Sequence, residues 1–295
     1  LQEDGYPILV QDKEGTLAPG AFSDELSAVI KERYPPIADL YMFWNESHRD
    51  FWVGVGLPKE KAVITGQPRS DFFFHPNRWP SKEELALDPK KKLLLFFVYD
   101  SEAYANSIDP SLQFLARPWS QLRTETFVEL KRLLDGQKDL EIIVKAHPQQ
   151  TDLADVRREM DSIFKGQVEL RTGSSQASHL IANADVIVGF QTTAMMEAMF
   201  TQKPIIYAGW GPLADQLDSY LIPIKNSGGC ESPSSAEEFG AELMRAVGGN
   251  TPVSEEMLRK RKEFRKIYFD LADGKVCERV LSLVESKITA SSKRP

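Results

Sequence analysis

Two carboxylates behind the first apolar segment of the chain are the earliest residues able to do chemistry. Residues 8–10 (ILV) are expected to form a strand, and Asp12, Glu14 and Gly15 follow it within the stretch QDKEGT. A carboxylate in a cleft acts as a general base toward a hydroxyl group. Because Asp and Gly also favour turns, an ordinary acidic turn is the favoured interpretation of these residues alone.

A His-Pro pair stands at the end of another expected strand. Residues 141–145 form that strand, and His147 and Pro148 follow it. A histidine at this position can donate a hydrogen bond to a phosphate, and the proline restricts the turn. The dipeptide recurs at His75, within a stretch rich in Pro, Lys and Asp, where we interpret it as a loop residue. The two histidines in predicted helices without a surrounding motif are interpreted as structural: His48 and His179.

Hydroxyl groups mark the end of the expected strand 186–190. Gln191, Thr192 and Thr193 follow it, and Glu197 comes four residues after Thr193. Threonines at a helix start either cap the helix or bind an anion together with its N–H groups. Since Glu197 would share a helix face with Thr193, the pattern suits a nucleotide, with phosphate at the helix start and ribose on the carboxylate. A plain cap with a solvated glutamate is the alternative, and the apolar residues around Glu197 disfavour it.

Two more strand ends carry candidate contact residues. Arg69 follows the expected strand 62–65 and suits either a phosphate or carboxylate partner, or a surface pair with Asp71. Trp210 lies in a glycine-flanked loop after the expected strand 204–207. Its indole can stack on a base or sugar or pack against the core, and packing is slightly favoured.

Composition narrows the class of protein. The 295 residues carry a net charge of −7, which argues against a nucleic-acid-binding surface over the whole chain. No apolar run approaches the roughly 18 residues of a membrane span. Two cysteines cannot form a disulfide framework, and a reducing compartment is expected. P-loop, dinucleotide-binding, serine-hydrolase and metal-ligand spacings are absent from the sequence, so no metal and no cofactor is expected.

Short apolar runs alternate with amphipathic segments along the chain. This alternation predicts an α/β fold with parallel sheets, including a Rossmann-like C-terminal domain. We expect residues 1–78 to be the C-terminal part of an N-terminal, acceptor-side α/β domain, 79–91 a linker, and 92–288 a nucleotide-sugar-binding domain with a closing helix. The stretch 254–284 is expected to be helical. The candidate residues then lie at carboxyl ends of strands, where ligands bind in such sheets.

In order along the chain, these segments resemble motifs of the GT-B-type glycosyltransferases of bacterial surface-carbohydrate (capsule and lipopolysaccharide) biosynthesis, close to the CMP-sugar-dependent Kdo, sialyl- and polysialyltransferases. The similar segments are the acidic motif at 12–15, TGQPRSD at 65–71, the HP motif at 145–148, the S/T motif with its EA at 191–198, and YF and DGK of a closing helix at 268–269 and 273–275.

The resemblance implies roles for these residues. The catalytic carboxylate comes from Glu14 or Asp12, because Lys13 occupies the first acidic position of the motif. The residues that the resemblance implies for contacts with the nucleotide and its phosphates are Lys145, His147, Pro148, Gln191, Thr192, Thr193 and Glu197. Those implied for contacts with the donor or the acceptor are Gly15, Arg69 and Trp210. The acidic motif lies late in the first domain of such enzymes, so most of that domain is expected to precede this chain.

Three functions remain open on these grounds. The main hypothesis is a metal-independent glycosyltransferase that moves a sugar from a nucleotide donor, CMP-Kdo or CMP-sialic acid, to a polysaccharide or glycolipid. A CDP-glycerol-type polyol-phosphate transferase is the alternative within the transferases. Lys13 motivates the third, a nucleotide-sugar-binding module without turnover.

The expected location of the protein in the cell follows from the kind of acceptor it uses. A glycan or glycolipid acceptor places the protein in the cytoplasm, at the inner face of the membrane for a lipid-linked acceptor. Peripheral membrane association would use the basic run 259–262 (RKRK), for which a solvated helix face is the favoured alternative. The sequence leaves the oligomeric state open.

Overall fold

The computed structural model describes residues 6–12, 31–32, 36–100, 116–173, 177–211, 214, 221–249 and 252–291. The chain divides into two compact units. Unit 1 comprises Leu1–Arg78 together with Glu263–Pro295, and unit 2 comprises Trp79–Lys262.

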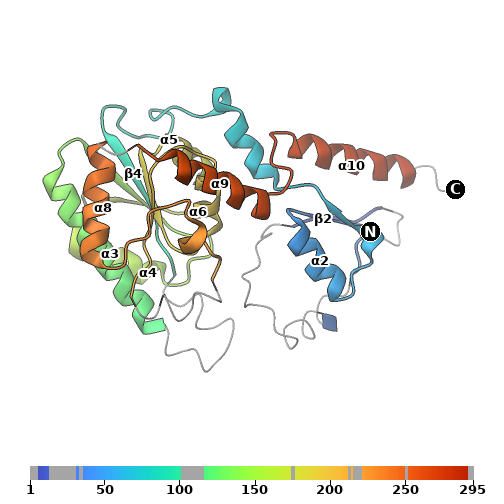
Figure 1. The fold of residues 1–295 in the computed structure, drawn as a ribbon, viewed down its shortest axis with the longest axis horizontal. Coiled ribbons are helices and arrows are strands. Elements are labelled where there is room, and N and C mark those ends of the chain that lie inside the picture. Colours follow the sequence, from blue (N-terminus) through green and yellow to red (C-terminus); the bar gives the residue numbers. More distant parts are fainter. Residues whose placement is uncertain are drawn as a thin grey trace. The chain divides into compact units, whose positions relative to one another are not determined.

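Unit 2 is built on a parallel five-stranded sheet (Figure 1). Its strands, in the order β6-β5-β4-β7-β8, are β6 (Glu169–Arg171), β5 (Leu140–Lys145), β4 (Lys92–Phe97), β7 (Val186–Gly189) and β8 (Ile205–Tyr207). Leu95 on the central strand pairs with Ile143 on one side and Ile187 on the other, and all three are fully buried. The continuous apolar runs of the sequence therefore match strands covered on both faces.

Helices cover both faces of this sheet (Figure 1). One face carries α3 (Ala116–Gly136), α4 (Leu153–Phe164) and α8 (Ala236–Gly248), and the other α5 (Ala177–Asn183) and α6 (Thr193–Ala198). The strand order reverses direction between β4 and β7. In doubly wound sheets the ligand crevice lies at the carboxyl ends of the two strands beside such a switch point.

Aromatic side chains fill the core of unit 2. The ring of Phe127 on α3 meets Phe96 of β4 at 5.7 Å and Phe164 of α4 at 5.5 Å, both edge to face. Burial of each such ring stabilises the fold by about 1.5–3 kcal/mol. This packing gives the strand ends a rigid support.

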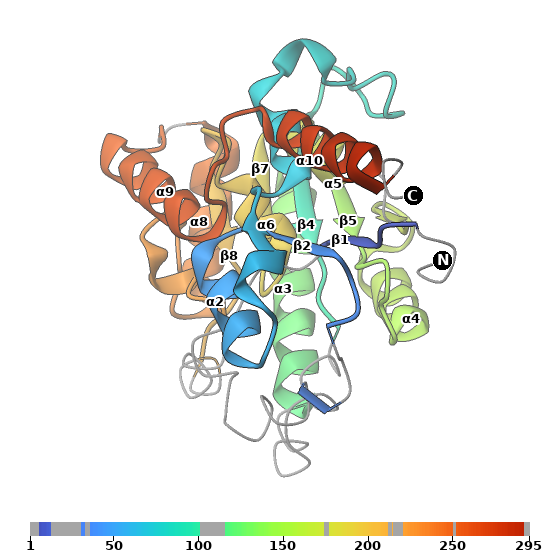
Figure 2. The same cartoon turned by 90° about the vertical axis from the view of Figure 1, so that its right-hand side faces the viewer.

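Unit 1 contains a parallel three-stranded sheet in the order β1-β2-β3. Its strands are β1 (Leu9–Gln11), β2 (Leu40–Phe43) and β3 (Ala62–Ile64), and α2 (Glu46–Gly54) connects the last two (Figure 2). Short 3₁₀ helices precede and follow β3 along the chain: η1 (Lys59–Lys61) comes before it, and η2 (Pro68–Phe74) and η3 (Pro76–Arg78) come after it. The α/β class and the parallel sheets predicted from the sequence are confirmed.

The prediction of one helical stretch over 254–284 is wrong. The structure has two helices, α9 (Glu255–Tyr268) and α10 (Val276–Ser291), with a break between them. Leu271 (φ 58°) and Gly274 (φ 81°) adopt left-handed backbone conformations in the break, which no α-helix accommodates. Residues 263–295 also pack with unit 1, whereas the sequence analysis placed residues up to 288 in the second domain.

Two further observations concern the surface and the loops. Within the part of the chain that the structure describes, no helix is long and apolar enough to cross a membrane. A 3₁₀ turn, η6 (Lys225–Ser227), lies between β8 and α8.

Candidate active site

His147 stands exposed on the loop after β5. Its Nδ1 accepts a hydrogen bond from the backbone N–H of Gln149 at 3.2 Å. A neutral imidazole that accepts at Nδ1 carries its proton on Nε2. The loop therefore presents His147 as an Nε2–H donor, the form that suits a phosphate oxygen.

A chain of side-chain contacts fixes this loop from one side. Gln150 Oε1 accepts from the backbone N–H of His147 at 3.2 Å, and its Nε2 donates to Asp152 at 2.7 Å. Asp152 pairs with the buried Arg123 of α3, whose Nε donates to Glu159 at 2.9 Å. Burial opposes the charge of Arg123, but the hydrogen bonds and charges of Asp152 and Glu159 outweigh it and raise the Arg123 pKa.

The switch-point strand β4 holds the same loop from the other side. Asp100, three residues past β4, accepts hydrogen bonds from the backbone N–H of Thr151 at 2.7 Å and from its hydroxyl at 2.5 Å. The carboxyl ends of β4 and β5 are thus joined by side chains, which limits the positions open to His147.

Lys145 is buried at the end of β5, directly below the loop. Its ammonium donates to the carbonyl oxygens of Ala146 at 2.7 Å and Gly173 at 2.6 Å. Burial lowers the Lys145 pKa. The predicted phosphate-binding lysine is therefore placed as a tie between the ends of β5 and β6.

The segment after β7 places the four polar residues in different settings. Thr192 caps α6 by accepting from the N–H of Ala194, and Thr193 is the first residue of the helix. Gln191 bonds the hydroxyl of Tyr207 at 2.7 Å and both backbone groups of Ile222, at 3.0 Å and 2.9 Å. Glu197 is buried and accepts from the Ser178 hydroxyl at 3.2 Å.

Trp210 and Pro148 complete the predicted residues of unit 2. The Trp210 indole N–H donates to Glu125 at 2.8 Å, and its ring lies 4.9 Å from that of Phe239. Pro148 is exposed beside His147. The structure brings Lys145, His147 and Pro148 together, and places Trp210 against α3 and α8.

In unit 1, Asp12 follows β1 and is tied to the neighbouring strand. Its backbone N–H donates to Met42 at 3.0 Å, and its backbone carbonyl accepts from the Trp44 indole at 2.9 Å. One carboxylate oxygen lies 3.1 Å from Nδ1 of His48. The sequence predicts only a structural role for His48. The signal that could have found it is the spacing in WNESHRDFW, where Asn45 caps a helix that carries His48 and Trp52 four residues apart.

Arg69 and Asp12 have a neighbour in common, Trp44. The guanidinium of Arg69 is 5.8 Å from the centre of the buried Trp44 ring, the same indole that donates to Asp12. An exposed arginine held over an aromatic face at a sheet edge is well placed for an anionic partner. Glu14 and Gly15 lie outside the described residues, so the structure gives no position for them.

The basic run of α9 is divided between two environments. Arg261 is 1% exposed and donates to the carbonyl oxygens of Gly229, Thr201 and Lys203. Arg259 is exposed and pairs with Glu256 of the same helix. Arg261 is therefore a structural clamp on the β8 region, which leaves a weaker basic surface than the sequence suggests.

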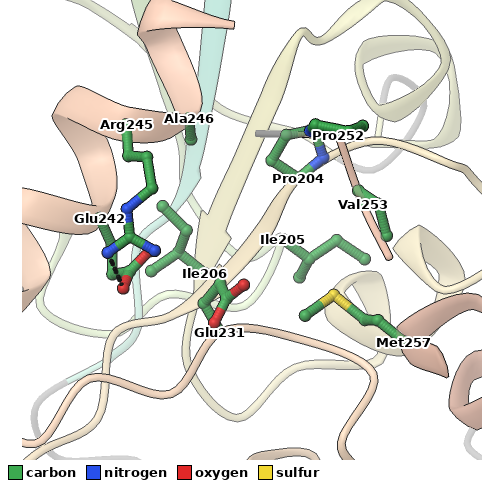
Figure 3. A pocket seen from close by; sticks show the side chains of 10 residues that line it. All are labelled: Pro204, Ile205, Ile206, Glu231, Glu242, Arg245, Ala246, Pro252, Val253 and Met257. Atoms are coloured by element: carbon green, nitrogen blue, oxygen red, sulfur yellow. Dashed lines mark hydrogen bonds and ion pairs between the residues drawn. The ribbon is translucent and has the colours of Figure 1, made fainter. Parts of the chain in front are cut away.

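A small cavity lies near the amino end of β8 (Figure 3). Its volume is about 30 Å³, room for one or two water molecules. Glu231 lines it, and burial, together with the charge of Glu242, raises the Glu231 pKa. Glu242 pairs with Arg245 there (Figure 3). This cavity is too small for a nucleotide. Among the described residues, His, Cys, Asp and Glu form no group of three able to hold a metal ion.

The parallel α/β units define a protein with a GT-B fold. The chain belongs to the CDP-glycerol:poly(glycerophosphate) glycerophosphotransferase family, whose model matches residues 38–286. No curated protein matches the sequence.

Solved structures support the fold. The wall teichoic acid polymerase TagF superposes with a TM-score of 0.64 at 14% identity, over 97% of this chain and 69% of its own. A putative UDP-N-acetylglucosamine 2-epimerase from Listeria monocytogenes gives 0.54 at 13% identity, over 96% and 74%. The S. aureus MnaA–UDP structure gives 0.54 at 15% identity, over 100% and 71%. At these identities the likeness shows the fold alone.

The main hypothesis from the sequence is a CMP-Kdo or CMP-sialic acid donor, and a CDP-glycerol-type transferase is its alternative. The family match supports the alternative better than the main hypothesis. The prediction of a transferase with a GT-B fold is confirmed, and the capsule and lipopolysaccharide assignment gains no support.

Proposed function

We propose that the protein transfers glycerol phosphate from CDP-glycerol to a hydroxyl group of a surface-polymer acceptor. The family match names this donor and this class of acceptor. The observation on which the proposal rests is the His147 loop, which is tied to β4, α3 and α4 and presents an Nε2–H donor at the carboxyl edge of a doubly wound sheet.

The proposed reaction is a phosphoryl transfer. The acceptor oxygen attacks the phosphorus that carries glycerol and forms a new P–O bond. The P–O bond to CMP breaks, and CMP leaves with the electron pair. Negative charge grows on the leaving phosphate, and a fixed donor such as His147 Nε2–H stabilises that charge because it needs no reorganisation. No step requires a metal ion in this scheme.

The segment after β7 is proposed to hold the nucleotide. Thr193 begins α6, and Glu197 lies one turn further on. Both lie on the helix that follows β7, one of the two strands beside the switch point, where a nucleotide is expected in this sheet. Gln191 and Thr192 would act through the shape of the loop, since both make hydrogen bonds to other groups of the protein.

The residues of unit 1 are proposed to serve the acceptor. Asp12 takes the proton of the attacking hydroxyl, with Glu14 as the other candidate base. Arg69 suits a poly(glycerophosphate) acceptor, because each repeat of such a polymer carries a phosphate charge. A lipid-linked acceptor would place the reaction at the cytoplasmic face of the membrane.

Ligand binding tests the donor. Thermal unfolding would be followed with CDP-glycerol, CMP-Kdo, CMP-sialic acid and UDP-N-acetylglucosamine, all at the same concentration. A ligand whose dissociation constant lies about 100-fold below that concentration stabilises by about 2.7 kcal/mol. Stabilisation by CDP-glycerol is expected. Stabilisation by the CMP-sugars alone would overturn the proposal.

Turnover tests the reaction and the role of His147. Release of CMP would be measured with a poly(glycerophosphate) acceptor for the wild type, His147→Ala and His75→Ala. The second variant is the matched control, because His75 belongs to the other His-Pro dipeptide and contacts Gly274. We expect His147→Ala to lose at least about 100-fold in kcat/KM. Binding of CDP-glycerol without CMP release by the wild type would indicate the non-catalytic module instead.

A further inference from the structure

A group of buried charged side chains lies behind the loop that carries His147. Arg123 on α3 donates through Nε to Glu159 at 2.9 Å and through a terminal nitrogen to Oδ2 of Asp152. The side chains of Arg123 and Asp152 are 4% and 5% exposed, whereas His147 is exposed. The loop therefore has a buried anchor between α3 and α4, which pack against each other on one face of the sheet (Figure 1).

Gln150 joins this anchor to the backbone of His147. Its Nε2 donates to Oδ1 of Asp152 at 2.7 Å, and its Oε1 accepts from the N–H of His147 at 3.2 Å. Asp152 thus offers one oxygen to Arg123 and the other to Gln150. The backbone N–H of Gln150 donates in turn to the carbonyl oxygen of His147 at 3.1 Å. Both backbone polar groups of His147 are therefore held by Gln150.

The chemistry of its two partners decides which way the Gln150 amide is turned. A carboxylate only accepts hydrogen bonds, and a backbone N–H only donates. The amide nitrogen must therefore face Asp152, and the amide oxygen must face His147. A reversed amide would set its oxygen against the carboxylate and its nitrogen against the N–H, so both hydrogen bonds would be lost.

We propose that Asp152 is a positioning residue for His147 and acts through the orientation of the Gln150 amide. Its carboxylate turns Gln150 Oε1 toward the N–H of His147, and the loop then holds the imidazole at a phosphate oxygen of the donor. In this role Asp152 touches neither the nucleotide nor the transferred group. All these residues belong to unit 2. The role of Asp152 rests on the proposed function of His147.

Two single substitutions break the contact between Asp152 and Gln150 in different ways. Asp152→Asn keeps an oxygen for Arg123 but sets an amide N–H₂ against Gln150 Nε2, which forces the Gln150 amide to reverse. Gln150→Glu sets two carboxylates against each other and leaves the buried arginine pair intact, so it carries the test if Asp152→Asn does not fold. Asp100 still holds the far end of the loop in both variants. We expect each substitution to lower kcat/KM for CMP release by about 10- to 100-fold.

The two substitutions together restore the contact with donor and acceptor exchanged. In the double variant Gln150→Glu with Asp152→Asn, the new amide donates to one oxygen of the new carboxylate, and the other oxygen accepts from the N–H of His147. The net charge equals that of the wild type. We expect kcat/KM to recover to within about 3-fold of the wild-type value, because the two changes compensate each other. A double variant no more active than the single variants would overturn the proposal.

Asp155→Asn is the matched control. It removes the same charge from the same helix, and Asp155 pairs with the exposed Arg158 at 2.8 Å. We expect this variant to keep the wild-type kcat/KM. A loss as large as that of Asp152→Asn would show that the charge of α4, and not the orientation of Gln150, matters for turnover.

Hydrogen exchange of the His147 backbone amide tests the contact without any substrate. This amide is protected while Gln150 Oε1 accepts from it. We expect exchange at least about 10-fold faster in each single variant than in the wild type, and a return to the wild-type rate in the double variant. Equal rates in all four proteins would contradict the proposal. If the wild type does not turn over CDP-glycerol, the proposed function fails, and the exchange rates decide whether Asp152 positions His147.

Discussion

Asp71 caps the helix that begins at Val276, 205 residues later in the chain. Its Oδ1 accepts from the N–H of Val276 at 3.0 Å, and its Oδ2 from that of Cys277 at 2.7 Å. A carboxylate at a helix start satisfies backbone donors and complements the helix dipole. The last residue of the TGQPRSD segment therefore holds the first turn of α10 in place.

Loss of this cap should destabilise unit 1. We expect Asp71→Ala to lower the free energy of unfolding by about 2 kcal/mol, because two backbone N–H groups lose their partner in a buried place. Urea unfolding would measure it. Asp50→Ala is the control, since Asp50 is exposed on α2 and its change should stay within about 0.5 kcal/mol. Equal effects of the two variants would refute the capping role.

Gly66 should not tolerate a side chain. Its φ is +87°, and an added Cβ would lie 2.8 Å from the carbonyl oxygen of Asp270. We expect Gly66→Ala to cost at least about 1–2 kcal/mol in thermal or urea unfolding. Gly54→Ala is the matched control: the site is helical with no atom near, and the change should stabilise by about 0.5–1 kcal/mol. If Gly66→Ala left the free energy of unfolding unchanged, the segment around Asp270 would have to be able to move away from the added Cβ.

Substitution of the two arginines of the basic run, Arg259 and Arg261, should lower the free energy of unfolding by very different amounts. Arg261→Ala leaves the carbonyl oxygens of Gly229, Thr201 and Lys203 without their donor, and we expect a loss of about 3 kcal/mol in the free energy of unfolding. Arg259→Ala removes an exposed pair on the same helix and should cost less than about 1 kcal/mol. Binding of anionic vesicles by the two variants would show separately whether this helix meets a membrane. Similar unfolding curves would contradict the clamp.

His48 should make stability depend on pH. Burial lowers its pKa from the ordinary value of 6.5, and the charge of Asp12 partly opposes this. The unfolded chain therefore takes up a proton near pH 6.5 that the folded chain refuses until a lower pH, so the stability contributed by His48 is lost as the pH falls below about 6.5. Above that pH the contribution is constant.

The His48→Asn variant isolates this effect. Urea unfolding at pH 7.5 and pH 5.5 should show a larger loss of stability for the wild type than for His48→Asn, which has no titrating ring. Asp12→Asn removes the charge that raises the His48 pKa, and should lower the titration midpoint of His48 further. An unchanged pH dependence in His48→Asn would show that the ring does not titrate differently in the folded state.

The order of elements was predictable because it depends on local patterns. Apolar runs such as that of β4 indicate strands covered on both faces, and the strand expected over 141–145 is β5 (Leu140–Lys145). The position of His147 at a strand end followed from the same patterns. The break at Gly274 was missed because the flanking residues are helical in type, and what begins α10 is a carboxylate from a distant segment.

The sequence by itself determined the α/β class, the strand ends that carry polar residues and the motif order of the family. These follow from periodicity and from neighbours a few residues apart. The tertiary structure alone decided that the charged groups of Lys145 and Arg261 donate to backbone carbonyls, and that the carboxylate of Asp12 lies beside the ring of His48. Such pairings depend on which distant side chains packing brings together, and no spacing along the chain encodes that.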